Sequence, residues 1–330
     1  MYTLNTLRNH ETDQFKGKSI MITGATGIVG YNLIKIFDDL ITKQSLKIKI
    51  FAIHKQPLPF FMKSFENKVN FIQGDIVKLV NDGTLPDADF IIHGAGYGQP
   101  EKFMNDPYLT IEINTFVTNY LLRKTGEKFI FLSSSEIYSG TNKEESLENE
   151  VGFTNTDHPR APYIEGKRLG ETLTLLANNE LDITSTVARL SLAYGPGAKI
   201  NDSRVLNQLI YRGLVNKKIE LRDSGESIRN YLYIADAVYI LTKLLLESKG
   251  GIFNVGGKSE VSIKELGKII AEILQVELTY PQNSFDHISP KRVKLNMTKT
   301  QETVGTVNFL EIEKGLLSTI EWYKFLLANN

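Results

Sequence analysis

Three glycines at regular spacing limit the fold of this chain more than any other feature. Gly24, Gly27 and Gly30 lie in the segment MITGATGIVG, directly after a β-branched run and at the start of a helical pattern. Glycine permits the tight turn and close backbone approach that a pyrophosphate needs, and the following helix offers it free backbone N–H groups. The spacing predicts a strand–turn–helix unit that binds a dinucleotide, with a purely structural turn as the alternative.

Short apolar runs rich in β-branched residues recur through the first half of the chain. They are SIMITG (19–24), KIKIFAI (47–53), VNFIQ (69–73), DFIIHG (89–94) and KFIFLS (128–133). Helix-like segments separate several of them, which is typical of βαβ units with a parallel sheet buried on both faces. The pattern predicts an α/β fold built on a Rossmann-type, doubly wound parallel sheet.

The chain length of 330 residues is about twice that of a usual single domain. We expect residues 1–17 to form an N-terminal extension and residues 18–190 to form mainly the dinucleotide-binding domain. Residues 191–330 are expected to form mainly a smaller C-terminal, substrate-binding lobe, with some segments returning to the first domain.

Composition excludes several classes of function. Lys plus Arg equals Asp plus Glu at 38 each, so the chain lacks the overall positive charge typical of nucleic-acid binding. It has no cysteine and five scattered histidines, which predicts neither disulfides nor a metal site. Neither a secretory signal nor a run of ~18 apolar residues is visible, so we expect a cytoplasmic protein without a membrane span.

The segment HPRAPYIEGKRLGE places Tyr163 and Lys167 four residues apart in a helical pattern. A tyrosine with a pKa near ~10 needs a nearby cation to act as a base at neutral pH, and residues four apart share a helix face. The pair alone is also compatible with chance. A third group, Ser134, ends a predicted core strand in FLSSSEIYSG and is followed by Glu136. Open α/β sheets bind ligands at this strand end, which favours a catalytic set.

The next two predicted strand ends concern the cofactor. The second strand ends in FAIHK, so His54 and Lys55 stand where an acid would bond the ribose of NAD. A cation there suits the 2′-phosphate of NADP, which leaves NAD, NADP and two merely solvated residues as alternatives. Asp75 and Ile76 in QGDI end the following strand, in a position suited to the adenine edge and face.

With these motifs in place, the sequence resembles the extended short-chain dehydrogenase/reductase family, in its nucleotide-sugar epimerase/dehydratase branch, over nearly the whole chain. The further matching segments are HGAG (93–96), Asn114 in IEINTFVTNYLL, YGPG (194–197), IRNYLYIADAV (228–238) and FNVGG (253–257). Within the branch, SSSEIY, PRAPYIEGKRLGE and INDSRVLNQLI look most like UDP-glucuronate decarboxylases. The 4,6-dehydratases usually have Asp where this chain has Ser135, and Leu192 replaces a common substrate-contacting Asn, so the sugar stays open.

The resemblance implies a set of site residues. The implied catalytic residues are Ser134, Glu136, Tyr163 and Lys167, the implied cofactor contacts are Gly24, Thr26, Gly27, Ile28, Gly30, His54, Lys55, Asp75, Ile76, Gly94, Ala95, Tyr163 and Lys167, and the implied substrate contacts are Ser135, Arg204, Arg229 and Arg292. It also implies a tightly bound, recycled NAD or NADP, a nucleotide-sugar substrate linked to UDP, and a homodimer formed by the Tyr163 helix and the helix containing NTFVTNYLLRK.

The implied reaction oxidises the sugar at C4, with Tyr163 as the base and Lys167 lowering its pKa. A carboxylate on C5 would then leave as carbon dioxide, aided by Glu136 and Ser135. A nucleotide-sugar 4-epimerase or 4,6-dehydratase is the alternative, and a non-catalytic dinucleotide-binding regulator is a further one.

Overall fold

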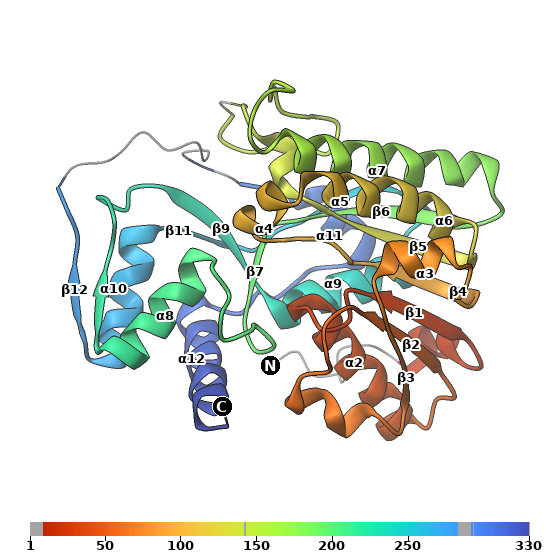
Figure 1. The fold of residues 1–330 in the computed structure, drawn as a ribbon, viewed down its shortest axis with the longest axis horizontal. Coiled ribbons are helices and arrows are strands. Elements are labelled where there is room, and N and C mark those ends of the chain that lie inside the picture. The colour runs from red at the N-terminus through yellow and green to blue at the C-terminus, as the bar shows by residue number, and fades with distance from the viewer. Residues whose placement is uncertain (1–8, 142, 283–291, 293, 330) are drawn as a thin grey trace.

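The protein is described by a computed structural model covering residues 9–141, 143–282, 292 and 294–329. Its largest element is a seven-stranded sheet in the order β10-β6-β5-β4-β1-β2-β3, in which every pairing is parallel (Figure 1). The strands are β1 Ser19–Thr23, β2 Lys49–His54, β3 Val69–Gln73, β4 Ala88–His93, β5 Thr125–Ser134, β6 Thr184–Leu190 and β10 Gly251–Val255. This is the Rossmann strand order, so the predicted fold class is confirmed.

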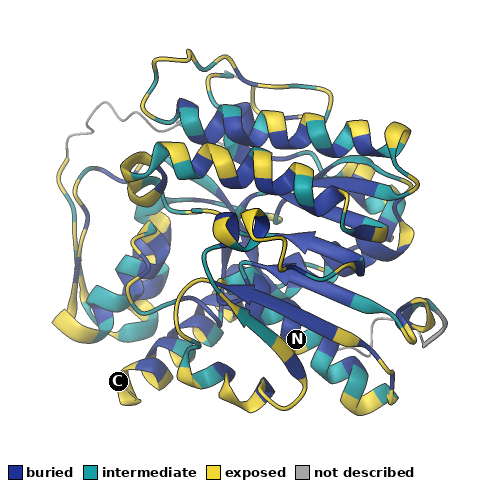
Figure 2. Cartoon of the chain, turned by 45° about the vertical axis from the view of Figure 1, so that its right-hand side comes forward, coloured by how far each residue is buried: buried dark blue, intermediate teal, exposed yellow. Residues whose placement is uncertain are grey.

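Helices cover both faces of this sheet. They are α2 Ile28–Gln44, α3 Ile76–Asn81, α4 Pro100–Asn105, α5 Pro107–Glu112, η4 Ile113–Val117, α6 Thr118–Leu122, α7 Ala161–Glu180, α9 Ile234–Glu247 and α11 Thr298–Val304. Successive strand side chains point to opposite faces, so Ile20 and Ile22 join the apolar cluster under α2 and α9, whereas Met21 joins the one under η4 and α6. Figure 2 shows the strands buried between these layers.

A smaller lobe lies at the left of Figure 1. It contains the sheet β11-β9-β7 and the pair β12-β8. Its elements are β7 Leu192–Tyr194, α8 Val205–Asn216, β8 Lys218–Glu220, β9 Ile228–Tyr233, β11 Ser259–Ser262, α10 Ile263–Leu274, β12 Glu277–Thr279 and α12 Ile312–Ala328. Between them, α9 and β10 return to the large sheet, and one apolar cluster runs through both parts.

The described part of the N-terminal segment belongs to the core. It forms α1 Asn9–Thr12 and η2 Asp13–Phe15. The ring of Phe15 is fully buried and meets those of Phe37 and Phe90 edge-on, at centroid distances of 5.3 and 5.5 Å. Of the helices in the described ranges, none is long and apolar enough to cross a membrane.

Parallel strands bring several predicted motifs to one edge of the sheet. The glycine loop follows β1, HGAG spans the end of β4, and Ser134 is the last residue of β5. Because β4 pairs with both β1 and β5, these three carboxyl ends are neighbours. The candidate site is therefore built on this edge, where open α/β sheets bind ligands.

Candidate active site

The glycine loop has a geometry that only glycine allows at two positions. Gly24 has a φ of 72°, and a Cβ there would lie 2.5 Å from the carbonyl oxygen of Gly94. A Cβ on Gly30 would lie 2.5 Å from the carbonyl oxygen of Gly24. Gly27 caps the 17-residue helix α2, and no side chain hydrogen-bonds to that end. A tight turn leading into an uncapped helix amino terminus fits a dinucleotide pyrophosphate, with Thr26 and Ile28 flanking the cap.

A buried histidine, which the sequence analysis did not single out, supports this loop. The Nδ1 atom of His93 lies 2.7 Å from the Thr23 hydroxyl, and its Nε2 lies 3.1 Å from the carbonyl oxygen of Ile113. Burial lowers the pKa of His93 to about 3, so the ring is neutral. The same hydroxyl accepts hydrogen bonds from the N–H groups of Gly94 and Ala95 at 3.1 and 3.0 Å. The network fixes the backbone that faces the glycine loop.

The two cations predicted at the end of β2 have different surroundings. The ring of His54 is buried, places Nδ1 2.7 Å from the carbonyl oxygen of Gln56, and meets Phe71 edge-on at 5.8 Å. The Lys55 side chain is half exposed, and its Nζ lies 2.8 Å from a carboxylate oxygen of Asp75. Lys55 is therefore the accessible cation at this strand end.

Asp75 is held by two interactions at the start of α3. Its carboxylate accepts a hydrogen bond from the N–H of Val77 at 3.1 Å and pairs with Lys55. Burial acts to raise the pKa of Asp75, but the bonds to Lys55 and to the helix amino terminus lower it overall. The carboxylate offsets the Lys55 charge, which reduces the attraction of this strand end for a 2′-phosphate. Ile76 is the first residue of α3.

The candidate base Tyr163 lies in the first turn of α7, which begins after a proline-containing turn. Its ring is buried and stacks on Phe103 of α4, with centroids 4.3 Å apart and planes at 11°. Burial raises the pKa of Tyr163 to about 12, while a side-chain hydrogen bond with Ser134 and the charges of Arg160 and Arg204 act to lower it. The phenol and Ser134 are thus brought together as predicted for a catalytic pair.

Lys167 lies one turn further along α7. Its Nζ donates to the carbonyl oxygen of Leu132 at 2.6 Å and lies 4.7 and 5.8 Å from the ring centroids of Phe131 and Tyr163. Burial lowers the pKa of Lys167 to about 7, although Glu171 acts to raise it. The ammonium shares a face with the phenol, but the cations that lower the pKa of Tyr163 here are Arg160 and Arg204.

Lys167→Met is expected to raise the free energy of unfolding. The pKa of Lys167 falls from 10.5 to about 7 on folding, so the cation costs stability below its unfolded pKa, and the full cost is present below about pH 7. We expect a gain of ~1–3 kcal/mol at about pH 6, after the loss of the bond to Leu132, that fades as the pH rises towards 10.5. Urea unfolding at several pH values tests this, and a loss of stability that does not change with pH would contradict it.

Glu136 has a cationic partner. It belongs to the short helix η5 Ser135–Tyr138, whose first turn is capped by the Ser134 hydroxyl, 3.2 Å from the N–H of Glu136. Both carboxylate oxygens accept from one nitrogen of Arg160, at 2.8 and 2.9 Å, and one also accepts from Ser139 at 3.3 Å. Arg160 precedes α7 and was not among the predicted site residues.

The arginines predicted to bind substrate have different partners. Arg204 is held by Asp202 through two nitrogens and donates to the carbonyl oxygen of Ala193 at 3.1 Å. Arg229 on β9 is partly buried, its desolvation lowers its pKa, and it lies within electrostatic reach of Glu136. Both therefore belong to the surroundings of the catalytic set.

Arg292 is partly exposed. Its guanidinium pairs with Glu260 of β11, with Nε 3.0 Å from the carboxylate. Its neighbours 283–291 and 293 lie outside the described residues. The predicted contact of Arg292 with substrate stays a prediction.

A buried ion pair supports the carboxyl end of β5. Arg189 of β6 and Glu171 of α7 are both almost fully buried and pair at 2.8 Å. Glu171 also accepts from the hydroxyl of Ser133, and Arg189 donates to the hydroxyl of Tyr138 at 2.8 Å. These bonds connect β5, β6, α7 and η5, and so fix the position of Ser134.

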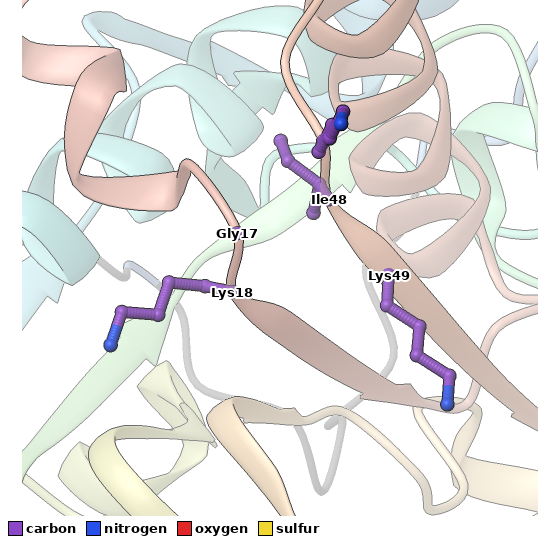
Figure 3. A pocket seen from close by; sticks show the side chains of 5 residues that line it. Gly17, Lys18, Ile48 and Lys49 are labelled. Atoms are coloured by element: carbon purple, nitrogen blue, oxygen red, sulfur yellow. The ribbon is translucent and has the colours of Figure 1, made fainter.

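A shallow depression elsewhere is not a candidate site. It is lined by Gly17, Lys18, Lys47, Ile48 and Lys49, at the amino ends of β1 and β2. Figure 3 shows the labelled side chains of Lys18 and Lys49 pointing away from one another. They therefore do not converge on a ligand, and the catalytic set lies at the opposite edge of the sheet.

Comparison with known proteins decides the family. Residues 20–256 match the family described as the NAD dependent epimerase/dehydratase family. The chain belongs to this family. The predicted family and the prediction of an enzyme are thereby confirmed, and the family's dependence on NAD confirms the expected dinucleotide cofactor.

This epimerase/dehydratase family member has curated relatives with a more specific name. It is 27% identical over 325 residues to UDP-glucuronic acid decarboxylase 1 of Xenopus tropicalis, covering 95% of this chain and 74% of the relative. UDP-glucuronic acid decarboxylase 6 of Arabidopsis thaliana is also 27% identical, over 319 residues, covering 94% and 90%.

Solved structures share the fold of this family member. A UDP-glucuronic acid 4-epimerase from Bacillus cereus is similar with a TM-score of 0.78 and 23% identity, covering 93% of this chain and 99% of that one. A dTDP-glucose 4,6-dehydratase from Streptomyces venezuelae gives a TM-score of 0.79 at 18% identity, covering 93% and 97%. At these identities the likeness concerns the fold alone.

Proposed function

We propose that this enzyme oxidises a UDP-linked uronic acid at C4 and decarboxylates it, as a UDP-glucuronate decarboxylase does. The observation that carries the proposal is the gathering of Glu136, Arg160 and Arg229 beside Tyr163 and Ser134. Charged groups of both signs next to a candidate base suit a substrate whose own carboxylate must be held while it reacts. The names of the curated relatives support the same activity.

Each candidate catalytic residue has a defined role in this scheme. Tyr163 removes the proton from the C4 hydroxyl, and Ser134 donates a hydrogen bond to the oxygen that becomes the C4 ketone. Arg160 and Arg204 provide the positive charge that favours the phenolate. Lys167, on the same face of α7 as Tyr163, is a candidate contact for the cofactor. NAD held at the glycine loop would supply the hydride-transfer chemistry at C4.

Decarboxylation follows from the ketone. The bond between C5 and the carboxylate breaks, carbon dioxide leaves, and the electron pair is delocalised into the C4 carbonyl, whose oxygen Ser134 stabilises. Glu136 and Ser135 orient the carboxylate or deliver the proton that C5 takes up after carbon dioxide has left. Arg204 and Arg229 are the chain's candidates for the substrate diphosphate, because a planar guanidinium matches phosphate oxygens.

A panel of UDP-, GDP-, CDP- and dTDP-sugars, read by mass spectrometry, tests the proposed activity. A decarboxylase removes about 44 mass units as carbon dioxide from a uronate and a dehydratase removes about 18 as water, whereas an epimerase leaves the mass unchanged. We expect the first result with UDP-glucuronate. Loss of water from a neutral sugar, or no loss at all, would favour the 4,6-dehydratase or 4-epimerase alternative.

Lys55→Glu is expected to weaken NADP binding far more than NAD binding. A carboxylate would repel the 2′-phosphate, whereas it could accept a hydrogen bond from the ribose hydroxyl of NAD. Asp75, 2.8 Å from Lys55, would strengthen the repulsion. Calorimetric titration should show at least a ~10-fold loss for NADP alone, with Lys55→Gln intermediate. Equal effects on both dinucleotides would show that Lys55 does not face the ribose.

We also propose a homodimer that uses the outer faces of α7 and of the α5–α6 helix. Leu169 and Leu176, seven residues apart and so on one face of α7, are 49% and 50% exposed, and Ile111 and Phe116 add exposed apolar area. These faces would be buried if they packed against the same faces of a second copy.

The double substitution Leu169→Glu with Leu176→Glu is expected to convert a dimer into a monomer in sedimentation velocity experiments, because two carboxylates would be buried without partners. Leu317→Glu is the control, since Leu317 on α12 is equally exposed at 50%. A dimer that survives the double substitution would place the interface elsewhere.

A further inference from the structure

Arg160 holds Glu136 in a partly buried ion pair at the N-terminus of α7. The side chains are 13% and 26% exposed, and one guanidinium nitrogen contacts both carboxylate oxygens at 2.8 and 2.9 Å. Pairs that are shielded from water interact more strongly than surface pairs, since the local dielectric constant is lower. The contact therefore holds the Glu136 carboxylate in place, and the guanidinium offsets the negative charge of that carboxylate.

The pair lies within electrostatic reach of both the base and a residue of the smaller lobe. Arg160 lies three residues before Tyr163, and both members of the pair are within electrostatic reach of the phenol. They are also within reach of Arg229, which comes from β9 of the smaller lobe. Glu136 is also two residues from Ser134, whose hydroxyl accepts from the Glu136 N–H at 3.2 Å and bonds with Tyr163, so a sugar whose C4 hydroxyl contacts Tyr163 lies near this pair.

The main chain fixes Arg160 at this place. Its N–H donates to Nδ1 of His158 at 3.2 Å, and its carbonyl oxygen accepts from the N–H groups of Tyr163 and Ile164, both at 3.1 Å. Arg160 thus immediately precedes the helix that carries the base. Its side chain contacts Glu136, which is 24 residues earlier in the sequence.

A lone carboxylate at Glu136 would oppose the proposed substrate. A uronate carries its own carboxylate on C5, and two like charges a few ångströms apart repel each other strongly away from water. With Arg160 in place, the pair has no net charge.

We infer that Arg160 is a positioning residue that makes this site able to accept anionic sugars, because by neutralising Glu136 it allows a uronate carboxylate to be bound beside it. The inference rests on the proposed function, since it takes a UDP-uronate as the substrate. It also explains why a glutamate is compatible with an acidic ligand in this site.

The test compares the binding of UDP-glucuronate and UDP-glucose by calorimetric titration of the NAD-saturated protein in a Tyr163→Phe background, in which the substrate is not turned over during the titration. Arg160→Met should weaken UDP-glucuronate at least ~10-fold and UDP-glucose less than ~3-fold, because only the first ligand meets the uncompensated carboxylate. Arg160→Lys keeps the charge and should restore most of the lost affinity. The double variant Arg160→Met with Glu136→Gln should restore it as well, since the repelling group is gone.

Two results would overturn the inference. They are an equal loss for both ligands in Arg160→Met and no recovery in the double variant. Binding of UDP-glucose shows that each variant is folded. The proposed decarboxylation is judged separately, because it fails if the wild-type protein releases no carbon dioxide even though the binding differences are found.

Discussion

Tyr163→Phe is expected to lower turnover at least ~10²-fold while cofactor binding and stability stay close to those of the wild type. The substitution removes one hydroxyl, which is the proton acceptor for the C4 hydroxyl of the sugar. The ring remains, so the stacking on Phe103 at 4.3 Å is kept. The Ser134 hydroxyl loses a partner but still caps η5.

Steady-state kinetics with UDP-glucuronate, together with thermal unfolding with and without NAD, would check this prediction. Tyr120→Phe is the matched control, because it removes a hydroxyl from α6, away from the site. A Tyr163→Phe protein that keeps more than about a tenth of the wild-type rate would show that Tyr163 is not the base, since general-base catalysis contributes at least ~10²-fold.

Glu136→Gln is expected to separate oxidation from decarboxylation. Oxidation at C4 depends on Tyr163, Lys167 and Ser134. The loss of carbon dioxide depends on further groups that orient the C5 carboxylate while it leaves. The amide keeps the shape of Glu136 but cannot take a proton or neutralise Arg160, 2.8 Å away. The variant should still bind nucleotide and reduce the cofactor in a single turnover, yet release carbon dioxide at least ~10²-fold more slowly.

Stopped-flow absorbance of the reduced nicotinamide and headspace measurement of carbon dioxide would separate the two steps. Glu165→Gln is the control, because Glu165 pairs with Arg168 on α7 and is 40% exposed. Carbon dioxide release that is unchanged in Glu136→Gln would remove this role and would strengthen the epimerase and dehydratase alternatives.

Much of the fold could be predicted because its signals are local. A run such as DFIIHG has the composition of a strand buried on both faces, and β4 Ala88–His93 is such a strand. The glycine positions likewise report local backbone needs, as the φ of 72° at Gly24 shows. Parallel pairing then brings the ends of β1, β4 and β5 to one edge without further information.

The charges of the site could not be predicted in the same way, because each depends on a partner that is distant in sequence. Lys55, just after β2, pairs with Asp75, just after β3, and Glu136 pairs with Arg160, which is 24 residues further along the chain. In the sequence, Arg160 looks like one more solvated residue before a helix. Burial, which sets the pKa values of Tyr163 and Lys167, also depends on the assembled core.

One measurement tests the central claim most directly. The purified wild-type protein, saturated with NAD, would be incubated with UDP-glucuronate labelled with carbon-13 at the carboxylate. Our account predicts that the label leaves as carbon dioxide in proportion to the UDP-pentose formed, with no net consumption of NAD. Label that stays in a UDP-hexuronate, whether epimerised or unchanged, would contradict it.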